Sequence, residues 1–158
     1  MSTGNKAAAL DAAEAPPVEV EEEFSAPKRL LRPWEAALVT FLCVTFTLFH
    51  LYVLNIYSLE PLLFRAIHVG WGGAIGFILS APFRRTGNNG VPWYDWILVA
   101  ASIACAIYIA VELDGLLFRA GAQFTTPDVI VGVVGTFLIL ELARRMTGLA
   151  LPLIASIF

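Results

Sequence analysis

Charged side chains are scarce in this sequence. Only 15% of the 158 residues are Asp, Glu, Lys or Arg, whereas a soluble domain carries about 25%. Hydrophobic residues make up 58% of the chain, and the mean hydropathy is +0.75. The apolar residues gather in long blocks rather than recurring at the spacing of a soluble core. The sequence therefore predicts an integral membrane protein.

Chemical motifs are lacking as well. The two cysteines, Cys43 and Cys105, both fall inside apolar blocks, and no CxxC or Cys/His spacing of a metal site is present. The sequence also lacks a soluble catalytic motif, a phosphate-binding loop and a basic nucleic-acid patch. We therefore expect no enzyme activity, no catalytic, substrate-binding or metal-binding residues, no cofactor in this chain and no nucleic-acid partner.

The first 27 residues differ in composition from the rest. They hold six acidic residues and a single basic one, Lys6, and they are rich in Ala, Pro and Glu. Such a segment cannot bury enough apolar surface to offset the entropy lost on ordering, so it predicts a disordered acidic tail. It lacks the basic and apolar regions of a secretory signal. A docking tail for a basic partner is the alternative interpretation.

The remainder predicts an all-α integral membrane fold. Residues 28–148 are expected to form a four-helix transmembrane domain, and residues 149–158 a short apolar C-terminal segment. The expected spans are about 34–57, 64–83, 93–111 and 127–143. Pro33 suits a first helical turn, and Asp95 favours a helix N-terminus. For the fourth helix we expect Thr126 as N-cap, Pro127 as the first helical residue and Asp128 as a partner of the helix dipole.

The fourth span is the shortest apolar run. Only twelve uncharged residues separate Asp128 from Glu141, which is roughly 18 Å of helix. To cross a bilayer, this helix must place Glu141, Arg144 and Arg145 near the second interface, where arginine head groups can extend outward. Glu141 precedes the two arginines by three and four residues, so the three side chains share a helical face and can pair.

The basic residues predict the orientation of the bundle. Their numbers in successive flanking segments alternate as three, one, two, one and two, in the order Lys28, Arg29 and Arg32; Arg65; Arg84 and Arg85; Arg119; Arg144 and Arg145. Because cytoplasmic flanks carry the excess of Lys and Arg, both termini are expected in the cytoplasm. Trp34, Trp93 and Trp96 are expected to anchor the bundle at the membrane interface.

The C-terminal "LALPLIASIF" is too short to cross the membrane again. It is either an interfacial amphipathic helix, a continuation of the fourth helix as one long rod, or the start of a longer protein that has been split here.

Two histidines fall within the apolar spans. His50 lies late in the first span and His68 early in the second, so the topology brings them to the same, periplasmic side. They are either ligands of a b-type haem or hydrogen-bonded packing residues. Near them in the second span, Gly72 and Gly76 predict a close helix-packing face. Charges at the outer ends of the spans, Arg65, Arg119 and Asp128 among them, are either solvated or part of a docking surface.

Several short motifs follow one another in a familiar order. Arg65-x-x-His68 opens the second span and Asp95-Trp96-x-Leu98 the third. Tyr108 follows, Asp128 opens the fourth, and Leu140-Glu141-x-x-Arg144-Arg145-x-x-Gly148 closes it before "LALPLIA". Over residues 28–158 this order resembles the four-helix N-terminal region of fused permeases of the TAXI type of TRAP (tripartite ATP-independent periplasmic) transporters.

The resemblance implies a small membrane subunit of the bacterial inner membrane that scaffolds a large permease subunit. That permease would hold the substrate and sodium sites, and a periplasmic TAXI-class binding protein would deliver an organic acid. The residues expected at the interface with the permease or binding protein are Arg65, His68, Gly72, Gly76, Arg119, Asp128, Glu141, Arg144 and Arg145. The small subunit of a tripartite tricarboxylate transporter and a haem-binding membrane anchor of a redox complex are the alternatives.

Overall fold

The structure is a computed structural model that describes residues 29–82, 90–120 and 122–157. The acidic tail expected at 1–27 and the basic residues Arg84 and Arg85 lie outside these residues. Every regular element of the described residues is an α-helix, and four of the helices are long and apolar enough to cross a membrane. This confirms the all-helical fold class, and the four helices indicate a multi-pass membrane protein.

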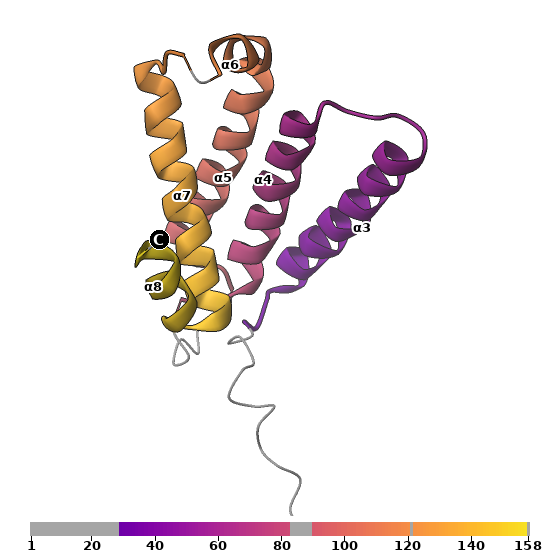
Figure 1. Ribbon diagram of the computed structural model, residues 1–158. Helices are drawn as coiled ribbons and strands as arrows, with labels where there is room; N and C mark the ends of the chain where they lie inside the picture. The colour runs from indigo at the N-terminus through magenta and orange to yellow at the C-terminus, as the bar shows by residue number, and fades with distance from the viewer. Residues whose placement is uncertain (1–28, 83–89, 121, 158) are drawn as a thin grey trace, which may run out of the picture.

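Six helices follow one another along the described chain. The long ones are α3 (Pro33–Asn55), α4 (Pro61–Leu79), α5 (Trp93–Val111) and α7 (Thr126–Thr147), and the short ones are α6 (Leu113–Arg119) and α8 (Ala150–Ile157). Figure 1 shows the long helices side by side, with α6 at one end of the bundle and α8 at the other. We call these the α6 end and the α8 end. The start of α3 and the end of α7 both lie at the α8 end, as four crossings require (Figure 1).

Helix α4 begins and ends earlier than the expected span 64–83. Pro61 occupies its first turn, where a missing N–H costs nothing, and the Glu60 carboxylate caps the helix by accepting a hydrogen bond from the Leu63 backbone N–H at 2.9 Å. At the other end Ser80 takes an extended backbone. Pro82 disfavours helical backbone in the residue before it, which explains the early stop.

The N-cap of α7 is Thr125 and its first helical residue is Thr126, so the expected cap Thr126 and the expected first residue Pro127 were each wrong by one residue. The Asp128 carboxylate accepts a hydrogen bond from the Thr125 backbone N–H at 2.9 Å and another from its hydroxyl at 2.7 Å. A capping box needs its acidic residue three positions after the N-cap, so Asp128 makes Thr125 the N-cap residue.

The end of α7 also differs from the expected 143. The helix continues through its charged turn to Thr147 and stops at Gly148, whose φ of 80° suits a residue without a side chain. Helix α8 then begins at Ala150 and folds back beside the lower end of α7 (Figure 1). The alternative in which the fourth helix continues to the C-terminus as one long rod is therefore wrong. None of the residues of α8 is buried within this chain.

Helices α4 and α5 form the closest pair. A Cβ added to Gly70 would lie 2.5 Å from the Cβ of Ala106, and one added to Gly73 would lie 2.6 Å from the Ser102 hydroxyl oxygen. The Ser102 hydroxyl donates a hydrogen bond to the Gly70 carbonyl at 3.0 Å. Small residues thus allow the two backbones to approach, but the glycines at this contact are Gly70 and Gly73 rather than the expected Gly72 and Gly76.

The apolar core lies toward the α8 end, where α3 and α7 join this pair. It contains residues from all four long helices: Val39, Ala74, Phe77, Ile78, Val99 and Leu138. The bundle is therefore held together most firmly at the end where its charged side chains are also buried.

Candidate functional site

A group of charged side chains is buried at the α8 end. We call it the buried charge cluster: Arg29, Asp95 and Arg145 at its centre, with Glu141 and Arg144, whose side chains are 17% and 26% exposed, at its edge. Asp95 is 0% exposed, and the side chains of Arg29 and Arg145 are each 2% exposed. Arg29 donates a hydrogen bond to one carboxylate oxygen of Asp95, and Arg145 Nη1 lies 2.8 Å from the other. The cluster ties the segment before α3 to the start of α5 and the end of α7.

Glu141 completes the cluster on α7. It accepts hydrogen bonds from Arg144 Nε and Nη2, each at 2.7 Å, and from Arg145 Nε at 2.8 Å. These are the pairs at spacings of three and four residues that the sequence predicts, and the structure confirms them. Arg145 therefore bridges two carboxylates, one on its own helix and one on α5.

Arg145 does not extend outward toward an interface, which corrects the expectation for this side chain. It points into the bundle, with its guanidinium 5.3 Å from the ring centroid of Phe77 and Nη1 3.4 Å from the Ser80 carbonyl oxygen. The physical reason is Asp95. A carboxylate removed from solvent needs a close counter-charge, and Arg145 supplies it from the neighbouring helix.

Glu35 is a second buried carboxylate at this end, 1% exposed. It accepts hydrogen bonds from the Arg32 backbone N–H at 2.8 Å and from the Val91 backbone N–H at 3.0 Å. This role was not predictable from the sequence, because Val91 is distant along the chain and offers only its backbone. Glu35 thereby fixes the start of α3 against the segment that leads into α5.

The tryptophans expected at the membrane interface lie at the same end. The rings of Trp34 and Trp96 stack with their centroids 5.9 Å apart, and Trp93 is 74% exposed. Tryptophan side chains are enriched at membrane–water interfaces.

The α6 end carries a smaller polar network around Asp128. The Tyr108 hydroxyl donates to its carboxylate at 2.6 Å, and Arg119 Nη2 lies 3.3 Å from the same oxygen and 3.4 Å from a carboxylate oxygen of Glu112. Arg119 and Asp128, both expected at a subunit interface, are thus paired with each other inside the chain. Their network connects α5, the α6 turn and α7.

One face of α4 remains open between α3 and α7, and we call it the open α4 face. Arg65 and His68 are exposed on it, and a Cβ added to Gly72 would meet nothing within 4 Å. Gly76 behaves differently, because its added Cβ would lie 2.8 Å from a methyl carbon of Leu142 on α7. Of the two glycines expected at a packing face, Gly76 packs within this chain and Gly72 faces outward.

The two histidines contact each other. His50 Nε2 lies 2.8 Å from His68 Nδ1, and His50 Nδ1 lies 2.7 Å from the Phe46 carbonyl oxygen. This geometry assigns the proton of neutral His50 to Nδ1, so that His68 Nδ1–H donates to His50 Nε2. Nitrogens that bind one iron from opposite sides lie about 4 Å apart, since a metal–nitrogen bond is about 2 Å. The pair is therefore arranged as a hydrogen bond rather than as two axial haem ligands.

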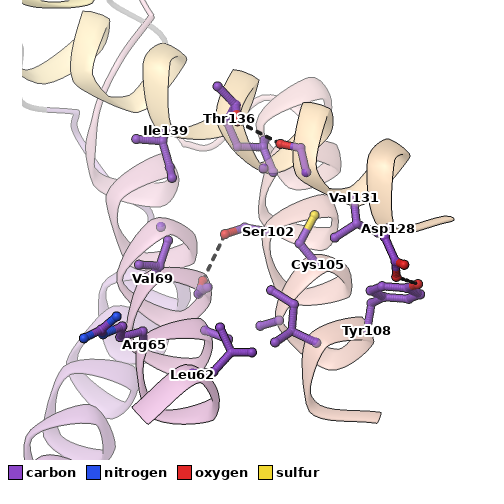
Figure 2. A pocket seen from close by; sticks show the side chains of 18 of the residues that line it. Leu62, Arg65, Val69, Ser102, Cys105, Tyr108, Asp128, Val131, Thr136 and Ile139 are labelled. Atoms are coloured by element: carbon purple, nitrogen blue, oxygen red, sulfur yellow. Dashed lines mark hydrogen bonds between the residues drawn. The ribbon is translucent and has the colours of Figure 1, made fainter. Parts of the chain in front are cut away.

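A groove of about 630 Å³ lies between α4, α5 and α7 (Figure 2). It extends from Phe77 and Leu142, deep in the bundle, to Arg65 and Asp128 near the α6 end. The sequence did not predict it, because the separation of α4 from α7 depends on how both pack against α5. The described residues contain no group of three or more His, Cys, Asp or Glu side chains placed to hold a metal ion.

The fold and these sites define a class: a helical protein with four candidate membrane spans, charges buried at one end and an open helix face. Searches of family models, curated proteins and solved structures give no match to this chain. The geometry and the sequence motifs are therefore the evidence for the function.

Proposed function

We propose that this chain is the small membrane subunit of a TRAP-type transporter, which scaffolds a larger permease subunit during binding-protein-dependent, sodium-coupled uptake of an organic acid. It would lie in the bacterial inner membrane with both termini in the cytoplasm and would catalyse no reaction itself. The order of motifs from Arg65 to Gly148 supports the family, and the open α4 face supports the need for a partner.

The observation that carries the proposal is the exposed position of His68. It lies within the apolar helix α4, and only its Nδ1 is used by His50. A polar side chain within a membrane span normally faces protein or water rather than lipid, because an unsatisfied polar group in hydrocarbon is costly. Gly72, one turn further along, leaves room for another backbone to approach. The open α4 face therefore suits a helix of a partner protein.

The interior of the bundle supports a scaffolding role rather than solute binding. The charged side chains of the described residues gather toward the two ends, and glycines and alanines close the contact between α4 and α5. Transporter sites are typically built where spanning helices are interrupted. The four long helices each run unbroken, so we assign the solute and sodium sites to the larger subunit.

Co-purification and uptake test the proposal together. The chain is reconstituted in vesicles with a large TRAP permease subunit and a TAXI-class binding protein, and sodium-driven uptake is measured. We expect uptake to require this chain, and we expect Gly72→Trp and His68→Leu to reduce both uptake and recovery of the permease. Ile107→Trp, on the exposed side of α5, is the matched control and should leave both unchanged.

Two results would overturn the proposal: full uptake without this chain, or wild-type recovery of the permease with both α4 variants. The identity of the co-purified subunit separates a TRAP transporter from a tricarboxylate transporter.

A further inference from the structure

We propose that the groove between α4, α5 and α7 binds one phospholipid from the bilayer leaflet at the α6 end. One acyl chain would lie in the groove, and the phosphate would pair with Arg65. This inference requires the bundle to lie in a bilayer, but it does not depend on the transport function proposed above.

The walls of the groove suit hydrocarbon. Their side chains are mostly apolar, and the hydroxyl groups among them are already used inside the chain. Ser102 donates to the Gly70 carbonyl at 3.0 Å, Thr136 to the Gly132 carbonyl at 2.8 Å and Tyr108 to Asp128 at 2.6 Å. Figure 2 shows Ser102, Cys105, Val131 and Ile139 around this space. An occupant without hydrogen-bonding groups therefore leaves none of these hydroxyls unsatisfied.

The dimensions of the groove match a lipid chain. Along α4 its lining runs from Leu62 to Phe77, and the part between Arg65 and Phe77 is about 18 Å long at about 1.5 Å per residue. One leaflet supplies about half of the roughly 30 Å hydrocarbon core. The volume of about 630 Å³ would hold roughly twenty methylene groups if each takes about as much space as a liquid water molecule, about 30 Å³.

A helix fits the groove less well than an acyl chain. A helix as long as α4, which has 19 residues, fills on the order of 2,000 Å³ as a cylinder of about 10 Å diameter. The groove would accept only a narrow ridge of it. A slender chain can instead follow the hollow left by Gly132 and Gly135, where an added Cβ would meet nothing within 4 Å.

Arg65, near the α6 end of the groove, would bind the phosphate of the lipid headgroup. Arg65 lines the groove, is exposed, and has no ion pair or hydrogen bond with any described residue. The Asp128 carboxylate, on the α7 side of the groove, is already compensated by Arg119 at 3.3 Å, so it does not cancel the charge of Arg65. Arginine pairs with phosphate through charge-assisted hydrogen bonds. Since lipid tails are as apolar as the groove, this pairing is what would hold one lipid in place.

Native mass spectrometry of the full-length chain in mild detergent tests the proposal. Dipalmitoyl phosphatidylglycerol is titrated in, and dipalmitoyl glycerol serves as a probe with the same chains but no phosphate. We expect one tightly bound phosphatidylglycerol per chain. Arg65→Gln should weaken its binding about tenfold, as expected for a lost charged hydrogen bond, and should leave the weak binding of dipalmitoyl glycerol unchanged.

Variants that fill the groove provide a second test of lipid binding. A Cβ added to Gly132 or Gly135 meets no neighbouring atom within 4 Å, and leucine favours a helix more than glycine does, so Gly132→Leu and Gly135→Leu should both fold. Because the new side chains occupy the groove, both variants should lose the bound lipid. Gly72→Leu makes the same change at an open glycine outside the groove lining and should keep the lipid. Equal binding by all variants, no preference for the phosphate-bearing probe, or a second copy of the chain in place of lipid would each overturn the proposal.

Discussion

The carboxylate of Asp95 on α5 and the guanidinium of Arg145 on α7 lie 2.8 Å apart inside the bundle, with both side chains almost completely removed from solvent. Arg29 approaches the same carboxylate from the segment before α3. Asp95 thus joins three parts of the chain. A buried charge with its partners removed is far more costly than the intact pair is stabilising, and this asymmetry determines how variants of the pair should behave.

Asp95→Asn should destabilise the bundle strongly, because it leaves the Arg29 guanidinium buried without a counter-charge and removes one of the two carboxylates that Arg145 contacts. We expect a loss of about 3–5 kcal/mol in the free energy of unfolding, measured by far-UV circular dichroism during denaturant titration in detergent. The matched control, Asp114→Asn, changes an exposed aspartate and should shift stability by less than about 0.5 kcal/mol.

A double variant tests the cause of that loss. Asp95→Leu with Arg145→Met removes both charges and should recover much of the stability, because well-packed apolar groups replace a buried pair at little cost. Arg29 precedes α3 and can turn its head group toward the interface. If the double variant is no more stable than Asp95→Asn alone, unpaired charge is not the cause.

Gly70→Val should force α4 away from α5, since the Cβ of Gly70 would lie 2.5 Å from that of Ala106. Overpacking of this kind costs about 1–3 kcal/mol, and the thermal midpoint of the purified protein should fall. Gly72→Val is the control at an open position of the same helix and should leave the midpoint unchanged or slightly higher. A wild-type midpoint for Gly70→Val would contradict the close contact.

The orientation of the bundle is tested by single cysteines in a chain whose Cys43 and Cys105 are replaced by Ser. Phe118→Cys at the α6 end should react with an impermeant maleimide added to intact cells, since Phe118 is 91% exposed. Ser156→Cys at the α8 end should react only after the membrane is opened. The reverse pattern would place both termini outside the cytoplasm.

The histidine pair predicts an optical result. Because His50 and His68 bond to each other, protein produced with ample haem should show no Soret band that depends on these residues. Absorbance spectra of the wild type and of His50→Leu/His68→Leu check this, and the two should coincide. A band that disappears in the double variant would instead favour a redox membrane anchor.

Patterns local to one segment were predictable. The bounds of α5 agree with the expected 93–111, because an interfacial aromatic group and a following apolar run mark both ends. The pairs between Glu141 and the two arginines were also predictable, since positions three and four apart on a helix are neighbours. The end of α7 was not, because the expected stop at 143 assumed that its charges face the membrane surface.

The sequence by itself determined that the chain forms four long apolar helices with charges at their ends, because apolar length and helix-terminal residues act within each segment. Only the tertiary structure decided that Asp95 meets Arg145, that Gly76 is covered while Gly72 is open, and that a groove separates α4 from α7. These outcomes depend on how each helix is rotated about its axis and how closely it approaches its neighbours. Packing between helices sets both.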